Sequence, residues 1–160
     1  MGDHSKESIP NVELVSQDGK RVRFLDLLEG RVVVVSFIYT TCAFVCPILG
    51  EQFSKLQTVL GDRLNRDINL ISISTDVKTD TPERLKAWSR NFGARPGWTL
   101  LTGKQEDVDR LTVALVGYQV GKNMHEPVVL LGNYDRGRWV TALGYAAPEK
   151  LLELAEEISK

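Results

Sequence analysis

Cysteine, histidine and methionine are scarce in this sequence, which contains two of each among its 160 residues. Both cysteines fall within one short stretch, residues 32–50, which reads VVVVSFIYTTCAFVCPILG. A single pair of cysteines is common in oxidising and in reducing compartments, so the cysteine count does not decide where the protein works. What needs an explanation is why both cysteines lie at one point of the chain.

The sequence also lacks a charge excess of either sign and a long apolar run. Its 20 basic and 21 acidic side chains give a formal charge of -1, which argues against nucleic acid or an anionic membrane as the main partner. The longest apolar run, Val32 to Val35, is too short to cross a bilayer. The start, MGDHSKES, lacks the pattern of a signal peptide. The chain is therefore expected to be cytoplasmic, or to be a soluble piece of a longer precursor.

No internal repeat, low-complexity segment or internal linker interrupts the sequence. We expect residues 1–8 to be a flexible polar tail and residues 9–160 to form a single domain, large enough to bury a core. A monomer is expected.

Strand and helix signals alternate along the chain. Val12 and Leu14, followed by Val22 and Phe24, flank Asp18-Gly19, which is the usual cue for a tight hairpin turn. Residues 32–38 are apolar on both faces, as expected for a central strand that is covered on both sides, so Val33 and Val35 should be buried. Further strands are predicted at 68–73, 98–101, 128–131 and 138–142, the last two bracketing the hairpin loop GNYDRG.

Helices are predicted between these strands. One begins near Pro47 and ends at Gly61, one begins with Thr81-Pro82 as N-cap and first turn, one runs from an N-cap at Thr102 to Gly117, and one begins at Pro148. Strands that alternate with helices indicate an α/β fold with a mainly parallel sheet, helices on both faces and hairpins as antiparallel edges. Ligands of such folds bind beyond the carboxyl ends of the strands.

The two cysteines lie at such a position. Cys42 follows the predicted central strand, and Cys46 precedes Pro47 at the start of a helix, whose partial positive charge should lower the pKa of both thiols. Three interpretations are possible: a structural disulfide, a redox pair, or half of a metal site. A disulfide closing so small a loop restrains the unfolded chain little, so stability alone explains the placement poorly.

Several segments resemble the SCO/SenC family, thioredoxin-like copper-binding factors for the assembly of cytochrome oxidase. SFIYTTCAFVCP resembles the family segment F-Y-T-x-C-P-x-x-C-P, and VELVSQDGKRVRFLDLLEGRVVVVSFIY is similar to its N-terminal hairpin and entry strand. ISISTDVKTDTPERLKAW and WTLLTG are similar to two later segments, so the likeness covers residues 12–103 and is weaker beyond. The resemblance implies a thioredoxin-like α/β fold, with a central mixed sheet flanked by helices and an N-terminal β-hairpin.

The resemblance also implies a metal site made of Cys42, Cys46 and a histidine in the loop before a late strand, for which His125 is the candidate. His4 lies in the predicted tail. Two thiolates and an imidazole suit Cu(I), and with a further ligand they can bind Cu(II). The resemblance implies that the chain binds one copper and acts as a carrier rather than an enzyme. The implied recipient is a cytochrome c oxidase subunit, and the implied further partners are other copper chaperones or thioredoxin-like reductants. The implied location is the periplasm or the outer face of the inner membrane, with an N-terminal anchor absent from this chain.

The sequence departs from the family pattern at two points. Ala43 stands where the family usually has proline, and MHEP, residues 124–127, replaces the more usual DHS. Within MHEP, Met124 offers a thioether as a further copper ligand, and Glu126 could orient the histidine. Asp76 and Asp80 match acidic positions of the family, and the alternative is that they serve only as turn and helix-start carboxylates. The alternative function is a thiol-disulfide oxidoreductase, or a peroxiredoxin-like protein, that uses Cys42 and Cys46 as a redox pair.

Overall fold

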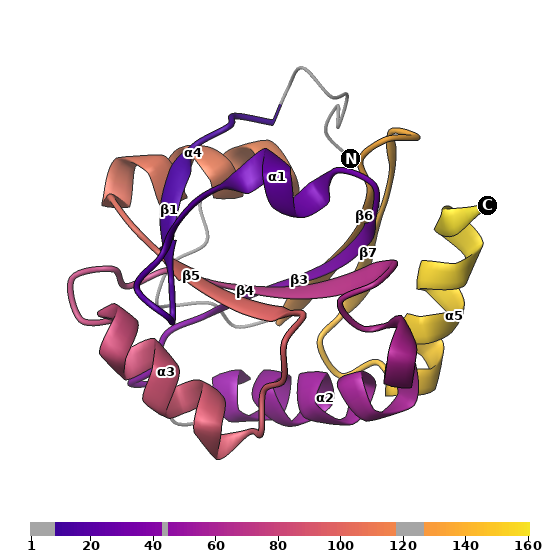
Figure 1. Ribbon diagram of the computed structural model, residues 1–160, viewed down its shortest axis with the longest axis horizontal. Coiled ribbons are helices and arrows are strands. Elements are labelled where there is room, and N and C mark those ends of the chain that lie inside the picture. The colour runs from indigo at the N-terminus through magenta and orange to yellow at the C-terminus, as the bar shows by residue number, and fades with distance from the viewer. Residues whose placement is uncertain (1–8, 43–44, 118–126) are drawn as a thin grey trace.

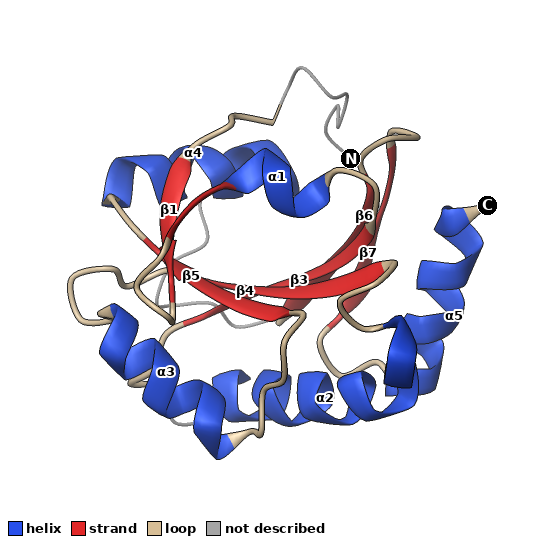
Figure 2. Cartoon of the chain, viewed as in Figure 1, coloured by secondary structure: helices blue, strands red, loops and turns tan. Residues whose placement is uncertain are grey.

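The computed structural model describes residues 9–42, 45–117 and 127–160, whose strands form one seven-stranded sheet (Figures 1 and 2). The order across the sheet is β2-β1-β5-β4-β3-β6-β7. In chain order the elements are β1 (Glu13–Ser16), β2 (Arg21–Arg23), α1 (Phe24–Leu28), β3 (Val32–Ile38), α2 (Val45–Leu60), η1 (Gly61–Arg63), β4 (Ile68–Ser74), α3 (Pro82–Asn91), β5 (Trp98–Thr102), α4 (Gln105–Val116), β6 (Val128–Asn133), β7 (Arg138–Leu143) and α5 (Pro148–Ser159). The predicted tail, residues 1–8, lies outside the described residues.

The sheet is mixed, and β3 lies inside it between β4 and β6. β3 pairs in parallel with β4 over its whole length and antiparallel with β6. β5 continues the parallel set, whereas β1, β2, β6 and β7 add antiparallel hairpins at the two edges. The predicted central mixed sheet and N-terminal hairpin are confirmed. The prediction that the sheet is mainly parallel is wrong, because β3–β4 and β4–β5 pair in parallel whereas the hairpin strands at both edges add antiparallel pairings.

Helices cover both faces of the sheet, as Figure 1 shows for α1 and α4 on one side and α2 and α3 on the other. Because side chains alternate along a strand, β3 contributes to two separate cores. Val33, Val35 and Phe37 pack with α1 and α4, whereas Val32, Val34 and Ile38 pack with α2, α3 and α5. Val33 and Val35 have no exposed surface, so the prediction of their burial is confirmed.

Helix boundaries follow the sequence cues at some ends and not at others. The Thr81 side chain accepts a hydrogen bond from the Arg84 backbone N–H, with Pro82 in the first turn, as predicted. Gly117 ends α4 in the left-handed conformation that glycine adopts without strain, also as predicted. The prediction of Thr102 as an N-cap is wrong, because Thr102 ends β5 and Lys104 precedes α4.

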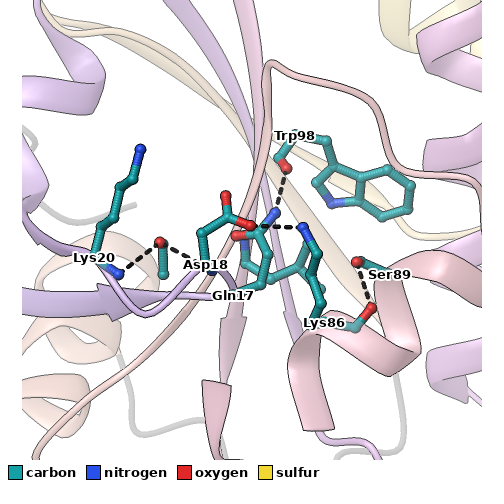
Figure 3. Close-up of polar contacts among 8 residues, drawn as sticks. Gln17, Asp18, Lys20, Lys86, Ser89 and Trp98 are labelled. Atoms are coloured by element: carbon teal, nitrogen blue, oxygen red, sulfur yellow. Dashed lines mark hydrogen bonds and ion pairs between the residues drawn. The ribbon is translucent and has the colours of Figure 1, made fainter. Parts of the chain in front are cut away.

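The N-terminal hairpin turns at Asp18-Gly19, where Gly19 has a positive φ of 76°. Phe24 was predicted in the second strand, but it begins the short helix α1, because its ring packs into the core between α1, α4 and β3. Figure 3 shows how the hairpin is fixed: the Lys86 amine of α3 lies 2.6 Å from the Asp18 carboxylate, and the Gln17 amide donates to the Trp98 carbonyl at 3.0 Å.

The C-terminal hairpin is longer than predicted. β6 extends to Asn133, so the turn shortens to residues 134–137, with Gly137 at a positive φ of 64°. α5 begins at Pro148 as predicted and packs against α2 and the sheet. Among the described residues, no helix combines the length and apolar character that membrane crossing requires.

Candidate metal centre

Both cysteines lie at the carboxyl end of β3, the edge at which ligands of such sheets bind. Cys42 is half-buried in the loop after β3, and Cys46 is fully buried in the first turn of α2. A buried strand leading directly into a short loop and a helix start therefore places both thiols at one point, as the sequence predicts. The structure shows both in the reduced thiol form, so the disulfide stays a prediction.

Hydrogen bonds connect the two cysteines. The Cys46 backbone N–H donates to the Cys42 Sγ at 3.3 Å, and the Tyr39 backbone N–H donates to the Cys46 Sγ at 3.4 Å. The Cys42 N–H in turn donates to the Tyr39 carbonyl at 3.1 Å. Each sulfur thus accepts a backbone N–H, a bond that becomes stronger when the sulfur carries negative charge. The arrangement can accept a thiolate pair or a metal bound to both sulfurs.

The metal-free protein nevertheless disfavours a thiolate at Cys46. Burial raises the pKa of the Cys46 thiol from 9.0 to about 12, and the hydrogen bond with the Cys42 side chain adds to this increase, whereas the Tyr39 N–H lowers the pKa. The expectation that the helix start lowers the pKa is therefore wrong for Cys46. The physical reason is that a thiolate there loses the hydration that water gives it, which outweighs the helix dipole.

Tyr39 belongs to the same cluster. Desolvation raises the pKa of the Tyr39 hydroxyl, and its hydrogen bond with the Cys42 side chain raises it further. The tyrosine stays protonated as a result and can donate to a charged sulfur. The sequence signal for this residue is the Tyr-Thr pair that precedes the cysteines in the family segment.

Asp80 lies close to the cysteine loop, although it is far from the cysteines in sequence. Its carboxylate is fully buried and accepts hydrogen bonds from the Thr40 backbone N–H at 3.1 Å, from the Thr40 hydroxyl and from the Ser74 hydroxyl at 2.7 Å. The carbonyl of Asp76 accepts from the Asp80 N–H at 2.9 Å, which makes Asp76 part of the turn before α3. The roles of Thr40 and Ser74 were not predicted, because in the sequence Thr40 is an ordinary loop residue and Ser74 an ordinary residue at the end of a strand.

His125 lies outside the described residues, as do Ala43, Met124 and Glu126. The structure does show where the chain continues after them. Pro127 is buried, its carbonyl accepts the Gly144 N–H at 2.9 Å, and β6 begins at the next residue. Since β6 runs antiparallel to β3, its first residues lie beside the carboxyl end of β3, where the cysteines are. Among the described residues, no three of the metal-binding side chains His, Cys, Asp and Glu form a cluster.

The sequence of this chain matches a known protein family. The SCO1/SenC family model matches residues 3–135. A protein of Stutzerimonas stutzeri named for copper binding is 31% identical over 110 residues, which are 69% of this chain and 52% of that protein. The chain spans about half the length of the curated relatives it matches.

Solved structures agree with the family model. BsSco, described as a member of the Sco family of cytochrome c oxidase assembly proteins with a disulfide switch, has a TM-score of 0.82 at 25% identity, covering 95% of this chain and 93% of BsSco. A SCO1/SenC family lipoprotein from Bacillus anthracis str. Ames has a TM-score of 0.81 at 26% identity, covering 95% of each chain. The fold is therefore thioredoxin-like, and the chain belongs to the SCO1/SenC family.

Proposed function

We propose that this chain is a copper carrier that binds one copper ion through Cys42, Cys46 and His125 and assists the assembly of the copper site of a cytochrome c oxidase. The observation that carries the proposal is the placement of the two thiols together at the carboxyl end of the central strand, joined by the hydrogen bond from the Cys46 N–H to the Cys42 Sγ. The copper-binding name of one relative and the cytochrome c oxidase assembly family of BsSco support it.

The donor atoms favour copper over a hard cation. Thiolate sulfur and imidazole nitrogen are preferred by Cu(I), whereas magnesium and calcium prefer oxygen. Copper has to displace the proton of Cys46, whose pKa of about 12 makes this step cost about 7 kcal/mol at about pH 7. Only an ion that forms strong bonds with sulfur offsets such a cost. The buried thiol therefore favours Cu(I) over weakly thiophilic metals.

The family pattern and the course of the chain support His125 as the third ligand. His125 precedes the buried Pro127 by two residues, and Pro127 leads into β6 beside the carboxyl end of β3. The proposed recipient is an oxidase subunit that carries a copper site, with other copper chaperones or thioredoxin-like reductants as further partners. A location outside the cytoplasmic membrane is supported by the lipoprotein of the same family.

The test is a titration of the reduced protein with Cu(I) against a competing chelator. We expect one Cu(I) per chain in the wild type, a large loss of affinity in Cys46→Ser, and weaker binding of Cu(II) in particular in His125→Ala. His4→Ala is the matched control and should bind as the wild type does. A stoichiometry other than one, or a Cys46→Ser variant with unchanged affinity, contradicts the proposal.

The thiol-disulfide oxidoreductase remains the alternative, and the same variants separate it from the carrier. Exchange needs an accessible thiolate as nucleophile, a role that the buried Cys46 with its raised pKa fits poorly, so the half-buried Cys42 would have to be the attacking thiol. Reduction of a dithiol substrate should be measured beside copper affinity. If His125→Ala leaves copper affinity unchanged, or if only the exchange activity is substantial, the oxidoreductase is the better description.

A further inference from the structure

We propose that Asp80 is a positioning residue for the thiol pair: its buried carboxylate fixes the loop after β3 and thereby places the sulfurs of Cys42 and Cys46 for binding one metal ion. The inference deepens the proposed function and rests on it for the identity of the metal. The positioning itself can be tested without copper.

The first step is the unusual burial of the carboxylate. Asp80 has no exposed surface, and a buried carboxylate is costly unless hydrogen bonds compensate for its lost hydration. Thr40 supplies its backbone N–H, at 3.3 and 3.1 Å from the two carboxylate oxygens, and also its hydroxyl. Ser74, the last residue of β4, donates its hydroxyl at 2.7 Å. Asp80 thus joins the ends of two neighbouring parallel strands.

The second step is that Asp80 is not the cap of the helix that follows it. Thr81 occupies that position and accepts the Arg84 N–H at 3.3 Å. An aspartate needed only to start α3 would direct its oxygens to the free N–H groups of the first turn. The carboxylate of Asp80 instead contacts the loop after β3, and Arg84 contacts the same loop through its Nε, 3.2 Å from the Thr40 hydroxyl.

The third step links Thr40 to both sulfurs. Thr40 follows Tyr39, whose N–H donates to the Cys46 Sγ and whose carbonyl accepts the Cys42 N–H. Fixing the backbone N–H of Thr40 therefore fixes the peptide plane that carries the Tyr39 carbonyl, because the peptide unit is planar. The path from Asp80 to the cysteines runs through two backbone groups of Tyr39. Displacement of this peptide moves the Tyr39 carbonyl that accepts the Cys42 N–H, and rotation about the Tyr39 backbone transmits it to the adjacent peptide, whose Tyr39 N–H donates to the Cys46 Sγ.

The test variants separate positioning from stability. Asp80→Asn keeps the shape of the side chain but replaces one carboxylate oxygen by an NH₂ group that faces the Thr40 and Ser74 donors. Thr40→Val removes the hydroxyl donor of Thr40 while retaining its backbone N–H. Thr40→Ser is the conservative variant and keeps both donors. Val108→Ala is the control for stability alone, since Val108 is a residue of α4 whose side chain is buried in the core on the other face of the sheet.

The readout is the equilibrium between the copper-free dithiol and glutathione disulfide, in which two thiols form one Cys42–Cys46 disulfide and two molecules of glutathione. This equilibrium reports how well the two sulfurs are placed relative to each other. We expect Asp80→Asn and Thr40→Val to change the equilibrium constant of this exchange by about tenfold, the effect of losing roughly one charge-assisted hydrogen bond. Thr40→Ser and Val108→Ala should stay within about twofold of the wild type. Urea unfolding of each variant checks that the protein is folded under the conditions in which the glutathione equilibrium is measured.

Copper affinity is then measured on the same variants, and the two results are distinguishable. A wild type that does not bind Cu(I) contradicts the proposed function but leaves the glutathione result to decide on Asp80. If both Asp80→Asn and Thr40→Val match Val108→Ala in the glutathione equilibrium, the positioning role is wrong and Asp80 only stabilises the fold. If Asp80→Asn does not fold, Thr40→Val alone decides between these outcomes.

Discussion

The raised pKa of Cys46 predicts that the reduced, copper-free protein loses stability in alkaline solution. The folded state retains the Cys46 proton up to about pH 12, whereas the unfolded chain releases it at the ordinary value of 9.0. Between these values the native state binds more protons than the unfolded state, so the free energy of unfolding falls as the pH rises. Below pH 9.0 the thiol is protonated in both states, and this contribution to stability is fully present.

The magnitude follows from the two pKa values. A separation of about 3 pKa units corresponds to a decrease of about 4 kcal/mol in the free energy of unfolding between pH 9.0 and about pH 12. At about pH 10 the expected loss from Cys46 is about 1.4 kcal/mol, since one pH unit above the unfolded pKa has been crossed. Other groups titrate in the same range, so the effect of Cys46 has to be isolated by a difference between variants.

The assay is urea unfolding at about pH 8 and about pH 10, with a reductant present, for the wild type and for Cys46→Ser. Serine keeps a small polar side chain that does not titrate in this range, although it lowers stability at both pH values. The wild type should lose about 1.4 kcal/mol more than Cys46→Ser between the two pH values. Equal losses in the two proteins refute the reasoning, because they show that the Cys46 thiol ionises in the folded state near its ordinary pKa.

The remaining predictions concern the core, a helix boundary and the thiol pair. Val33→Asp should prevent folding, because it buries an unpaired charge between the sheet and α1; a soluble variant with the unfolding midpoint of Val33→Thr contradicts this. Thr81→Ala should lower the free energy of unfolding by about 1 kcal/mol through loss of the N-cap bond, whereas Thr81→Ser should not, as urea unfolding can check. Mild oxidation should join Cys42 and Cys46 within one chain, seen as a loss of two hydrogens by mass spectrometry; thiols that stay free under oxidant argue against the pair.

The sequence by itself predicted the features that depend on near neighbours. The β-branched run at 32–38 indicated a buried central strand, Thr81-Pro82 marked the start of a helix, and Gly117 marked the end of another. The placement of Cys42 and Cys46 after that strand indicated a site, and the family resemblance is confirmed. These predictions succeeded because capping, turns and strand burial are specified by a few adjacent residues.

Tertiary structure decided the features that depend on residues distant in sequence. Cys46 lies at a helix start, which by itself lowers a thiol pKa, yet the packing of α2 against the sheet excludes water from its sulfur and raises the pKa instead. Asp80 contacts Thr40, 40 positions away, only because β3 and β4 pair in parallel and end at the same edge. Phe24 forms part of a helix because the core between α1 and β3 accepts its ring. Desolvation and partners from other strands are set by how the layers pack, and neighbouring residues in the sequence do not specify them.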